Sequence, residues 1–286
     1  MIIEFTKNNT VLSDFTDFDL KQTFTCGQCF RWEVLPDGSY QGIAWGKLLK
    51  ISQDETSFTL HNVSQQEYID IWEKYFDIGR DYSAIKQSLA ISDTMKKSIA
   101  AGSGIRILRQ DIWETILSFI ISASNNIPRI KKIIASLCEN FGEPIENGFY
   151  SFPSPDKLKG ITVEELAPIK AGFRAKYIVD AVNKANSGEV NIYSLESLDT
   201  ASARKELLKI NGVGNKVADC ILLFSLGRTE VFPVDVWIKN TMCALYPEKC
   251  SSVADARSVG PEIFGENCGI AQQYLFYYAR ENGGNI

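Results

Sequence analysis

The chain has 286 residues, of which 45% are hydrophobic and 23% are charged, a composition typical of a soluble globular protein with one large or two ordinary domains. The longest apolar stretch, residues 116–123, is too short to span a bilayer, and the N-terminus has no signal-peptide pattern, so we expect a cytoplasmic protein that does not enter membranes. The net charge of −5 argues mildly against bulk binding of nucleic acid but leaves the distribution of basic residues open.

The first hundred residues predict an antiparallel sheet followed by short helices. Strand-like segments alternate with turn signals such as Pro36-Asp37-Gly38, which is typical of a hairpin. The expected strands are residues 30–34, 39–45, 48–52 and 57–60, and the expected helices are about residues 66–76, 82–89 and 94–100. Ser103-Gly104 is a break in the pattern, so we place a sheet domain at residues 1–103 and a helical domain at residues 104–286.

The second part of the chain is predicted to be almost entirely helical. Asp111 is expected to cap a helix that is apolar nearly all round and therefore central, and Pro128 suits the first turn of the next. The expected helices are residues 112–123, 128–141, a short one from 154, 173–185, 202–209, 216–226, 235–245, 253–264 and 270–282. The fold class is therefore α+β.

The segment from Ile210 to Lys216 reads as a helix-hairpin-helix motif. Gly212 and Gly214 let the backbone turn tightly and approach a ligand closely. The amides that follow open a helix, where free N–H groups and the helix dipole favour an anion. A nucleic-acid phosphate is the natural target of such a turn.

Lys216 and Asp235 are expected to meet. The helix that starts near Lys216 ends at Gly227, and the stretch 228–234 is extended enough to return over the length of that helix. Asp235 then caps the next helix near the lysine amine. A protein that only binds DNA needs neither residue. Burial and a helix N-terminus both favour the neutral form of a lysine, which can attack carbon, and a nearby carboxylate can stabilise the positive charge that develops on the sugar.

Cysteine and histidine usage limits the chemistry. Seven cysteines without a secretion signal suggest reduced thiols. Cys243 and Cys250 lack the short Cys-x-x-Cys step expected of an iron–sulfur site, so we expect no cluster. A single histidine, His61, nearly excludes a histidine-based zinc site or a Ser-His-Asp triad.

Several motifs spread over nearly the whole chain resemble the helix-hairpin-helix DNA glycosylases, and within them the 8-oxoguanine DNA glycosylases. The matching segments are residues 27–32 (Gly-Gln-Cys-Phe-Arg-Trp), 108–111, 124–129, 173–177, 212–220 and 233–236, with Ala271-Gln272 and Phe276 near the end. The resemblance implies a TATA-binding-protein-like antiparallel sheet domain followed by a helical domain in two parts, with the active site between those parts.

The resemblance also implies a function. It is that of a bifunctional glycosylase and lyase that extrudes 8-oxoguanine from duplex DNA, displaces it through a Lys216 Schiff base and cuts the strand by β-elimination. A monomer that needs no cofactor is expected, in the cytoplasm or on the nucleoid if the source is bacterial. Two alternatives stay open: a glycosylase of the same fold for another damaged base, for example an oxidised pyrimidine, and a noncatalytic DNA-binding protein.

Site residues follow from the same resemblance. Lys216 and Asp235 match the catalytic pair. The carbonyl of Gly27 matches the acceptor for the N7–H of 8-oxoguanine, a hydrogen that guanine lacks. Gln272 matches the residue that reads the Watson–Crick edge, and Cys220 and Phe276 match the pair between which the base is held. The DNA-binding positions are Asn125, Arg129, Phe173, Arg174, Gly212, Gly214 and Val217. Main-chain oxygens of Leu208, Ile210 and Val213 match a structural cation site for a monovalent or divalent ion.

Three positions depart from the pattern of the animal enzymes. Phe173 stands in place of a tyrosine wedge, Ser124 in place of a gap-filling asparagine, and Trp237 in place of a phosphate-contacting histidine, while Arg129 keeps the match to the reader of the opposite cytosine. The departures concern opposite-base preference and the opening of the duplex rather than the core chemistry.

Overall fold

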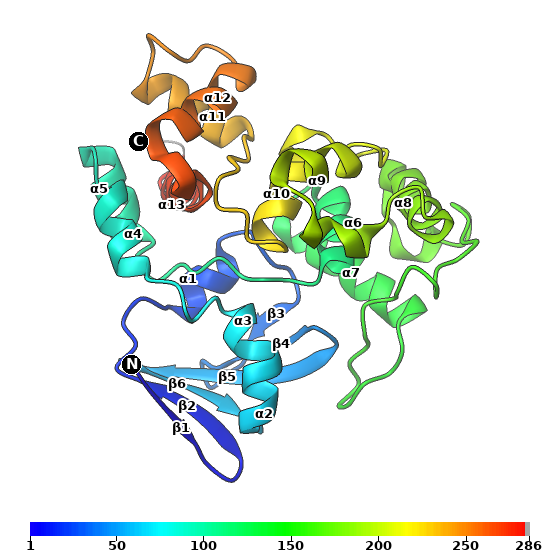
Figure 1. Ribbon diagram of the computed structural model, residues 1–286. Helices are drawn as coiled ribbons and strands as arrows, with labels where there is room; N and C mark the ends of the chain where they lie inside the picture. Colours follow the sequence, from blue (N-terminus) through cyan, green and yellow to red (C-terminus); the bar gives the residue numbers. More distant parts are fainter. Residues whose placement is uncertain (284–286) are drawn as a thin grey trace.

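The computed structural model describes residues 1–283 and has the predicted α+β architecture, with a sheet followed by a larger helical region (Figure 1). The sheet is antiparallel, has six strands and runs in the order β1-β2-β6-β5-β4-β3. Its strands are β1 (Ile2–Phe5), β2 (Asn9–Ser13), β3 (Trp32–Val34), β4 (Tyr40–Ala44), β5 (Lys47–Asp54) and β6 (Ser57–His61). The last four confirm the four strands predicted from the sequence.

Two strands and one helix of the N-terminal part were not predicted. Strand β1 is largely exposed, so it carries no alternating apolar pattern that a sequence could reveal. Strand β2 buries only Thr10 and Leu12 and pairs with β6, which lies far along the chain. Helix α1 (Leu20–Thr25) is capped by Asp19, whose carboxylate accepts a 2.7 Å hydrogen bond from the Gln22 amide.

Helices of the middle and C-terminal parts largely follow the prediction. Their bounds are α2 (Gln65–Glu67), a π-helical turn (Tyr68–Trp72), α3 (Glu73–Tyr75), α4 (Tyr82–Leu89), α5 (Asp93–Ala101), α6 (Ile112–Ser122), α7 (Ile127–Phe141), α8 (Ala175–Ser187), α9 (Thr200–Leu207), α10 (Asn215–Phe224), α11 (Val236–Leu245), α12 (Val253–Phe264) and α13 (Cys268–Glu281). Asp111 caps α6 as expected. The short helix expected from Ser154 is wrong: residues 155–160 form turns, because the Leu158 amide closes a single turn onto Ser154 and Gly160 follows in a left-handed conformation.

Two hydrophobic cores divide the molecule. One lies between the sheet and α1–α3, and it includes Trp32, Trp72 and Phe76. The larger core joins the helices from α4 onward, and α5 packs against α13 although most of the chain separates them (Figure 1). By packing, α4 and α5 therefore belong with the helical part, and the boundary between residues 103 and 104 stays a prediction.

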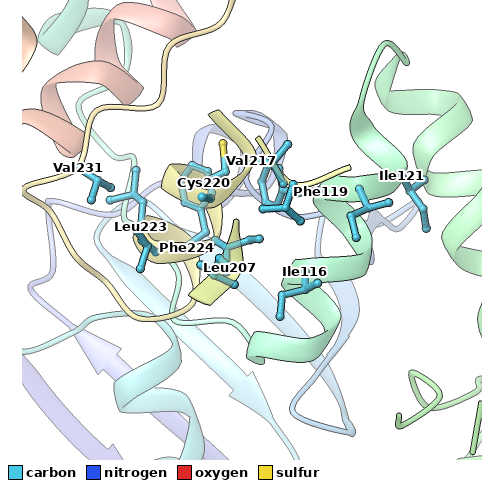
Figure 2. Close-up of a cluster of buried hydrophobic side chains, with 14 of the residues drawn as sticks. Ile116, Phe119, Ile121, Leu207, Val217, Cys220, Leu223, Phe224 and Val231 are labelled. Carbon is cyan, nitrogen blue, oxygen red and sulfur yellow. The ribbon is translucent and has the colours of Figure 1, made fainter. Parts of the chain in front are cut away.

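Helix α10 is held at the centre of the larger core by α6 and α9. Phe119 of α6 stacks on Phe224 of α10 with ring centroids 5.5 Å apart. Cys220 and Val217 of α10 lie in the same cluster, next to Leu207 of α9 (Figure 2). This packing fixes α10 from both sides and therefore sets where its first turn, with Lys216, can lie.

Candidate functional site

The hairpin before α10 has the tight geometry that its glycines predict. Gly212 has a φ of +87°, and a β-carbon there would lie 2.7 Å from Cγ of Tyr177, so only glycine fits. Asp180 of α8 holds the turn by accepting 2.7 Å hydrogen bonds from the backbone and side-chain nitrogens of Asn211. Gly214 is exposed at the N-cap of α10, and no side chain caps the free amides of the first turn.

Lys216 and Asp235 lie at the first turns of α10 and α11, and both line one cleft, as the sequence predicted. The Asp235 carboxylate caps α11 through a 2.8 Å hydrogen bond from the Ile238 amide. Burial raises the pKa of Asp235 above its ordinary value, and the Ile238 amide and the nearby Lys216 ammonium offset part of that rise. The Lys216 amine lies 5.3 Å from the centroid of the Phe119 ring, so it is in apolar surroundings on one side.

The same cleft brings together all the residues expected to bind a base. It leaves about 340 Å³ free of protein atoms, counting the space open to solvent. Its walls come from α6, α10, α13, the segment before α11 and the loop after α1. The lining residues are Cys26, Gly27, Phe119, Lys216, Cys220, Phe224, Pro233, Asp235, Gln272, Gln273 and Phe276.

Two features of the cleft suit a planar polar ligand. The Oε1 atom of Gln272 is buried and has no hydrogen-bond partner within residues 1–283, a costly state that a ligand donor would relieve. Phe276 and Cys220 supply apolar surface, and burial raises the pKa of the Cys220 thiol to about 11, which keeps it neutral. Gly27 has a φ of +89°, and a β-carbon there would lie 3.4 Å from the Phe276 ring.

The residues expected to touch DNA outside the cleft differ in exposure. Phe173 is 53% exposed and Arg129 is also exposed, whereas Val217 is buried in the core. Arg174 is only 2% exposed, and its guanidinium donates to the carbonyls of Ala123, Ser124 and Ala171. It thus holds the loop after α6 and is not free to reach outward.

That loop contains Asn125, which is only partly exposed. Its Nδ2 donates to the carbonyl of Ile121 at 3.1 Å, while its Oδ1 accepts from the Asn126 amide at 3.0 Å. Ser124 takes a left-handed conformation with a φ of 49°. The loop is therefore tightly specified, with its shape fixed by local bonds and by Arg174.

Sequence reasoning missed a buried ion cluster directly behind Lys216. Asp219 is fully buried, and its carboxylate accepts from Nε of Arg204 on α9 at 2.8 Å and from Nε of Arg257 on α12 at 2.9 Å. The only signal in the sequence is a lone aspartate inside the apolar run of α10. The cluster connects α10 to helices on both sides of the cleft.

Comparisons with known proteins agree over almost the whole chain. A family model described as "8-oxoguanine DNA glycosylase, N-terminal domain" matches residues 10–116, and "HhH-GPD superfamily base excision DNA repair protein" matches residues 117–256. An Arabidopsis thaliana protein named N-glycosylase/DNA lyase OGG1 is 33% identical, over 91% of this chain and 77% of that protein. The chain belongs to the N-glycosylase/DNA lyase family.

Two further members have the same extent. A probable N-glycosylase/DNA lyase from Methanothermobacter thermautotrophicus is 31% identical over 93% of this chain and 95% of that protein. The Clostridium acetobutylicum 8-oxoguanine glycosylase/lyase, solved with DNA containing cytosine opposite 8-oxoG, is 44% identical, with a TM-score of 0.95 over 99% of both chains. The N-glycosylase/DNA lyase fold thus accounts for both parts of the chain.

A metal ion could be held in this chain by side chains or by main-chain oxygens, and the two cases differ. Within residues 1–283, no three histidine, cysteine, aspartate or glutamate side chains gather closely enough to hold an ion. The carbonyls of Leu208, Ile210 and Val213 lie around the hairpin turn, where the Ile210 carbonyl already accepts a 3.0 Å bond from the Val213 amide. A cation held by these oxygens and the absence of an iron–sulfur cluster both stay predictions. None of the helices described in residues 1–283 has the length and apolarity needed to cross a membrane.

Proposed function

We propose that this protein is a bifunctional DNA glycosylase and lyase that removes 8-oxoguanine from duplex DNA and then cuts the strand. The single observation that carries the proposal is the cleft that Lys216 and Asp235 line together with Gly27, Gln272 and Phe276. The description of the family model that matches residues 10–116 supports the choice of lesion, and so does the C. acetobutylicum enzyme, whose complex contains DNA with 8-oxoG opposite cytosine.

Recognition begins with extrusion of the lesion, because its glycosidic bond cannot be reached inside the stacked duplex. The flipped base would lie between Phe276 and Cys220, with the unpaired Gln272 oxygen accepting from its Watson–Crick edge. The carbonyl of Gly27 would accept the N7–H of 8-oxoguanine. Guanine lacks that hydrogen, so it would leave the carbonyl unpaired at a cost of about 1–3 kcal/mol.

Catalysis then proceeds through an amine. After its ammonium has lost a proton, Lys216 attacks C1′ of the nucleoside, the bond from C1′ to the base breaks, and the base departs with the electron pair of that bond and takes up a proton. Loss of a proton from nitrogen and opening of the sugar give a Schiff base. That cation acidifies C2′, so removal of a C2′ proton expels the 3′ phosphate and cuts the strand.

Asp235 supports the first step by charge. Its carboxylate lies at the same cleft, and it would stabilise the positive charge that develops on the sugar as the base leaves. The cap that it provides to α11 keeps one carboxylate oxygen in a fixed place, bonded to the Ile238 amide. Capping and catalysis therefore use the same geometry.

DNA is held by the hairpin and by the surface around the cleft. The free amides after Gly212 and Gly214 would bind a backbone phosphate at the N-terminus of α10. Exposed Phe173 would press into the duplex, and Arg129 would read the base opposite the lesion. Arg174 and Asn125 would act indirectly, by fixing the loop that carries these contacts. We further propose a monomer, located in the cytoplasm or on the nucleoid if the source is bacterial.

The decisive experiment is borohydride trapping. A duplex with 8-oxoguanine opposite cytosine is incubated with wild type, Lys216→Gln and the matched control Lys249→Gln, an exposed lysine paired with Glu262. Wild type and the control are expected to form a covalent adduct, and Lys216→Gln none. Adducts with an oxidised pyrimidine alone would favour a different base specificity, while DNA binding without adduct or free base would favour a noncatalytic protein.

A further inference from the structure

The Gly27 backbone is fixed from outside its own loop, because glycine has no side chain to hold it. Gly27 lies between α1 and β3 and has a φ of +89°, in the left-handed region. A carbonyl that must discriminate two bases by one hydrogen bond needs a defined direction, since such bonds weaken steeply with misalignment. The neighbours on both sides of Gly27 supply that definition.

Gln273 of α13 holds the peptide before Gly27. Its Nε2 donates a 2.8 Å hydrogen bond to the carbonyl of Cys26, across a separation of 247 residues in the chain. Gln273 is only 2% exposed, and it directly follows Gln272, the proposed reader of the base edge. Helix α13 thus positions Gln272, which is proposed to contact the base, and through Gln273 it also holds the backbone next to Gly27.

Gln28 and Gln110 hold the backbone that follows Gly27, including the Gln28–Cys29 peptide. The fully buried side chain of Gln28 donates to the carbonyl of Arg106 at 2.8 Å and accepts from the amide of Leu108 at 2.9 Å. Gln110 in turn donates a 2.7 Å hydrogen bond from Nε2 to the carbonyl of Gln28. The carbonyls on either side of Gly27 are therefore both bonded to glutamine side chains.

We infer that Gln273 is a positioning residue for lesion recognition, which fixes the direction of the Gly27 carbonyl by holding the peptide plane in front of it. Gln110 does the same for the plane behind. This inference rests on the proposed function. It extends that function by assigning part of the base discrimination to the side chains of Gln273 and Gln110, here called the clamp, in addition to the cleft residues.

The clamp acts on base recognition alone. An abasic site carries no base, so the Gly27 carbonyl has nothing to accept there, and Lys216 can still form its Schiff base. Loss of the clamp should slow release of 8-oxoguanine and leave cleavage at a preformed abasic site unchanged. A residue that merely supports the fold would change both rates together.

The test compares Gln273→Met with wild type. Methionine has a similar length and cannot donate a hydrogen bond. Single-turnover release of 8-oxoguanine is expected to fall roughly tenfold, the effect of about 1.4 kcal/mol on a barrier, while strand cleavage at an abasic site stays within about twofold. Tyr274→Phe is the matched control on the same helix, because its buried hydroxyl has no partner to lose within residues 1–283.

Several outcomes would overturn the inference. Equal loss of both activities, or no loss of either, would each reject a role in positioning the Gly27 carbonyl. A wild-type protein inactive on both substrates would instead reject the proposed function. If Gln273→Met fails to fold, as thermal unfolding would reveal, Gln110→Met removes the bond on the other side of Gly27 and must produce the same split between the two activities.

Discussion

Asp219 lies three residues after Lys216, one turn further along α10, and is the point at which that helix is anchored to its neighbours. Its carboxylate is shared between Arg204 of α9 and Arg257 of α12. Because α12 packs with α11 and α13 on the other side of the cleft, the cluster joins the element that carries the amine to the elements that carry Asp235 and the base-reading residues.

Asp219→Asn should destabilise the protein and misplace Lys216. A buried carboxylate that is bonded to two guanidinium groups cannot be removed cheaply, and the loss is expected to be about 3 kcal/mol in the free energy of unfolding. Urea unfolding followed by circular dichroism measures it. The borohydride-trapped fraction should fall under conditions where the variant is still folded, and an unchanged midpoint together with full trapping would contradict the anchoring role.

Asp235→Asn should inactivate the enzyme while maintaining or raising its stability at neutral pH. Burial raises the pKa of Asp235, so the folded protein favours the protonated carboxyl and the ionised carboxylate opposes folding. The favourable contribution of the protonated form is complete below the unfolded pKa of about 3.9 and is lost as pH rises through the folded pKa. Asparagine removes the charge and can still accept from the Ile238 amide. Thermal unfolding at neutral and acid pH tests the change, and the gain should vanish below about pH 3.9.

The rate of base release should depend on the same carboxylate. Only the ionised form of Asp235 can stabilise a cationic sugar, so single-turnover release of 8-oxoguanine should fall with decreasing pH, and the fall should begin above the ordinary pKa of aspartate. A rate profile measured from pH 4 to 8 tests this, with the range chosen to span roughly the carboxylate region. A flat acid limb would exclude Asp235 as the charged group.

Gly27→Ala should impair discrimination of the lesion more than it impairs stability. The φ of +89° is costly for alanine, by about 1–2 kcal/mol, and its β-carbon would press against the Phe276 ring at 3.4 Å. We expect release of 8-oxoguanine to fall at least tenfold, with abasic-site cleavage retained. The measurement compares the rates on a duplex with 8-oxoguanine and on a duplex with an abasic site, together with the free energy of unfolding. Full activity on 8-oxoguanine would count against the role of Gly27.

Phe173 and Arg174 are adjacent, yet they should behave oppositely. Arg174→Ala removes hydrogen bonds to three backbone carbonyls and should lower the free energy of unfolding by about 2 kcal/mol. Phe173→Ala changes an exposed side chain, so stability should stay within about 0.5 kcal/mol while base release from a fully paired duplex slows. An 8-oxoguanine opposite an abasic gap, which needs less opening, should be affected least.

The sequence predicted best what local chemistry determines. The hairpin, the N-cap of Asp235 and the return of its segment to Lys216 follow from turn residues and helix length. The meeting of Gly27 with Gln272 came from the family resemblance alone, since no local pattern relates the two segments. Strand β1 was missed because an exposed edge strand needs no apolar alternation.

Gln273 and the partners of Asp219 show a second limit. A buried glutamine or aspartate in a helix must have a hydrogen-bond partner, but the sequence does not indicate which residue that partner is. The bond between residues 26 and 273, for example, joins positions that no sequence spacing relates. Phe173, Arg129 and Arg174 share one predicted role, yet only burial in the folded protein separates the inward-bonded Arg174 from its exposed neighbour.

Contact between α13 and the loop that carries Gly27 has a consequence for biosynthesis. The hairpin and Lys216 precede α13 along the chain, so they are synthesised before the helix that carries Gln272 and Gln273. Until α13 docks, the Cys26 carbonyl lacks its glutamine partner and the cleft lacks one wall. Packing of α13 against α5 and against the loop after α1 therefore completes the part of the site that selects the lesion.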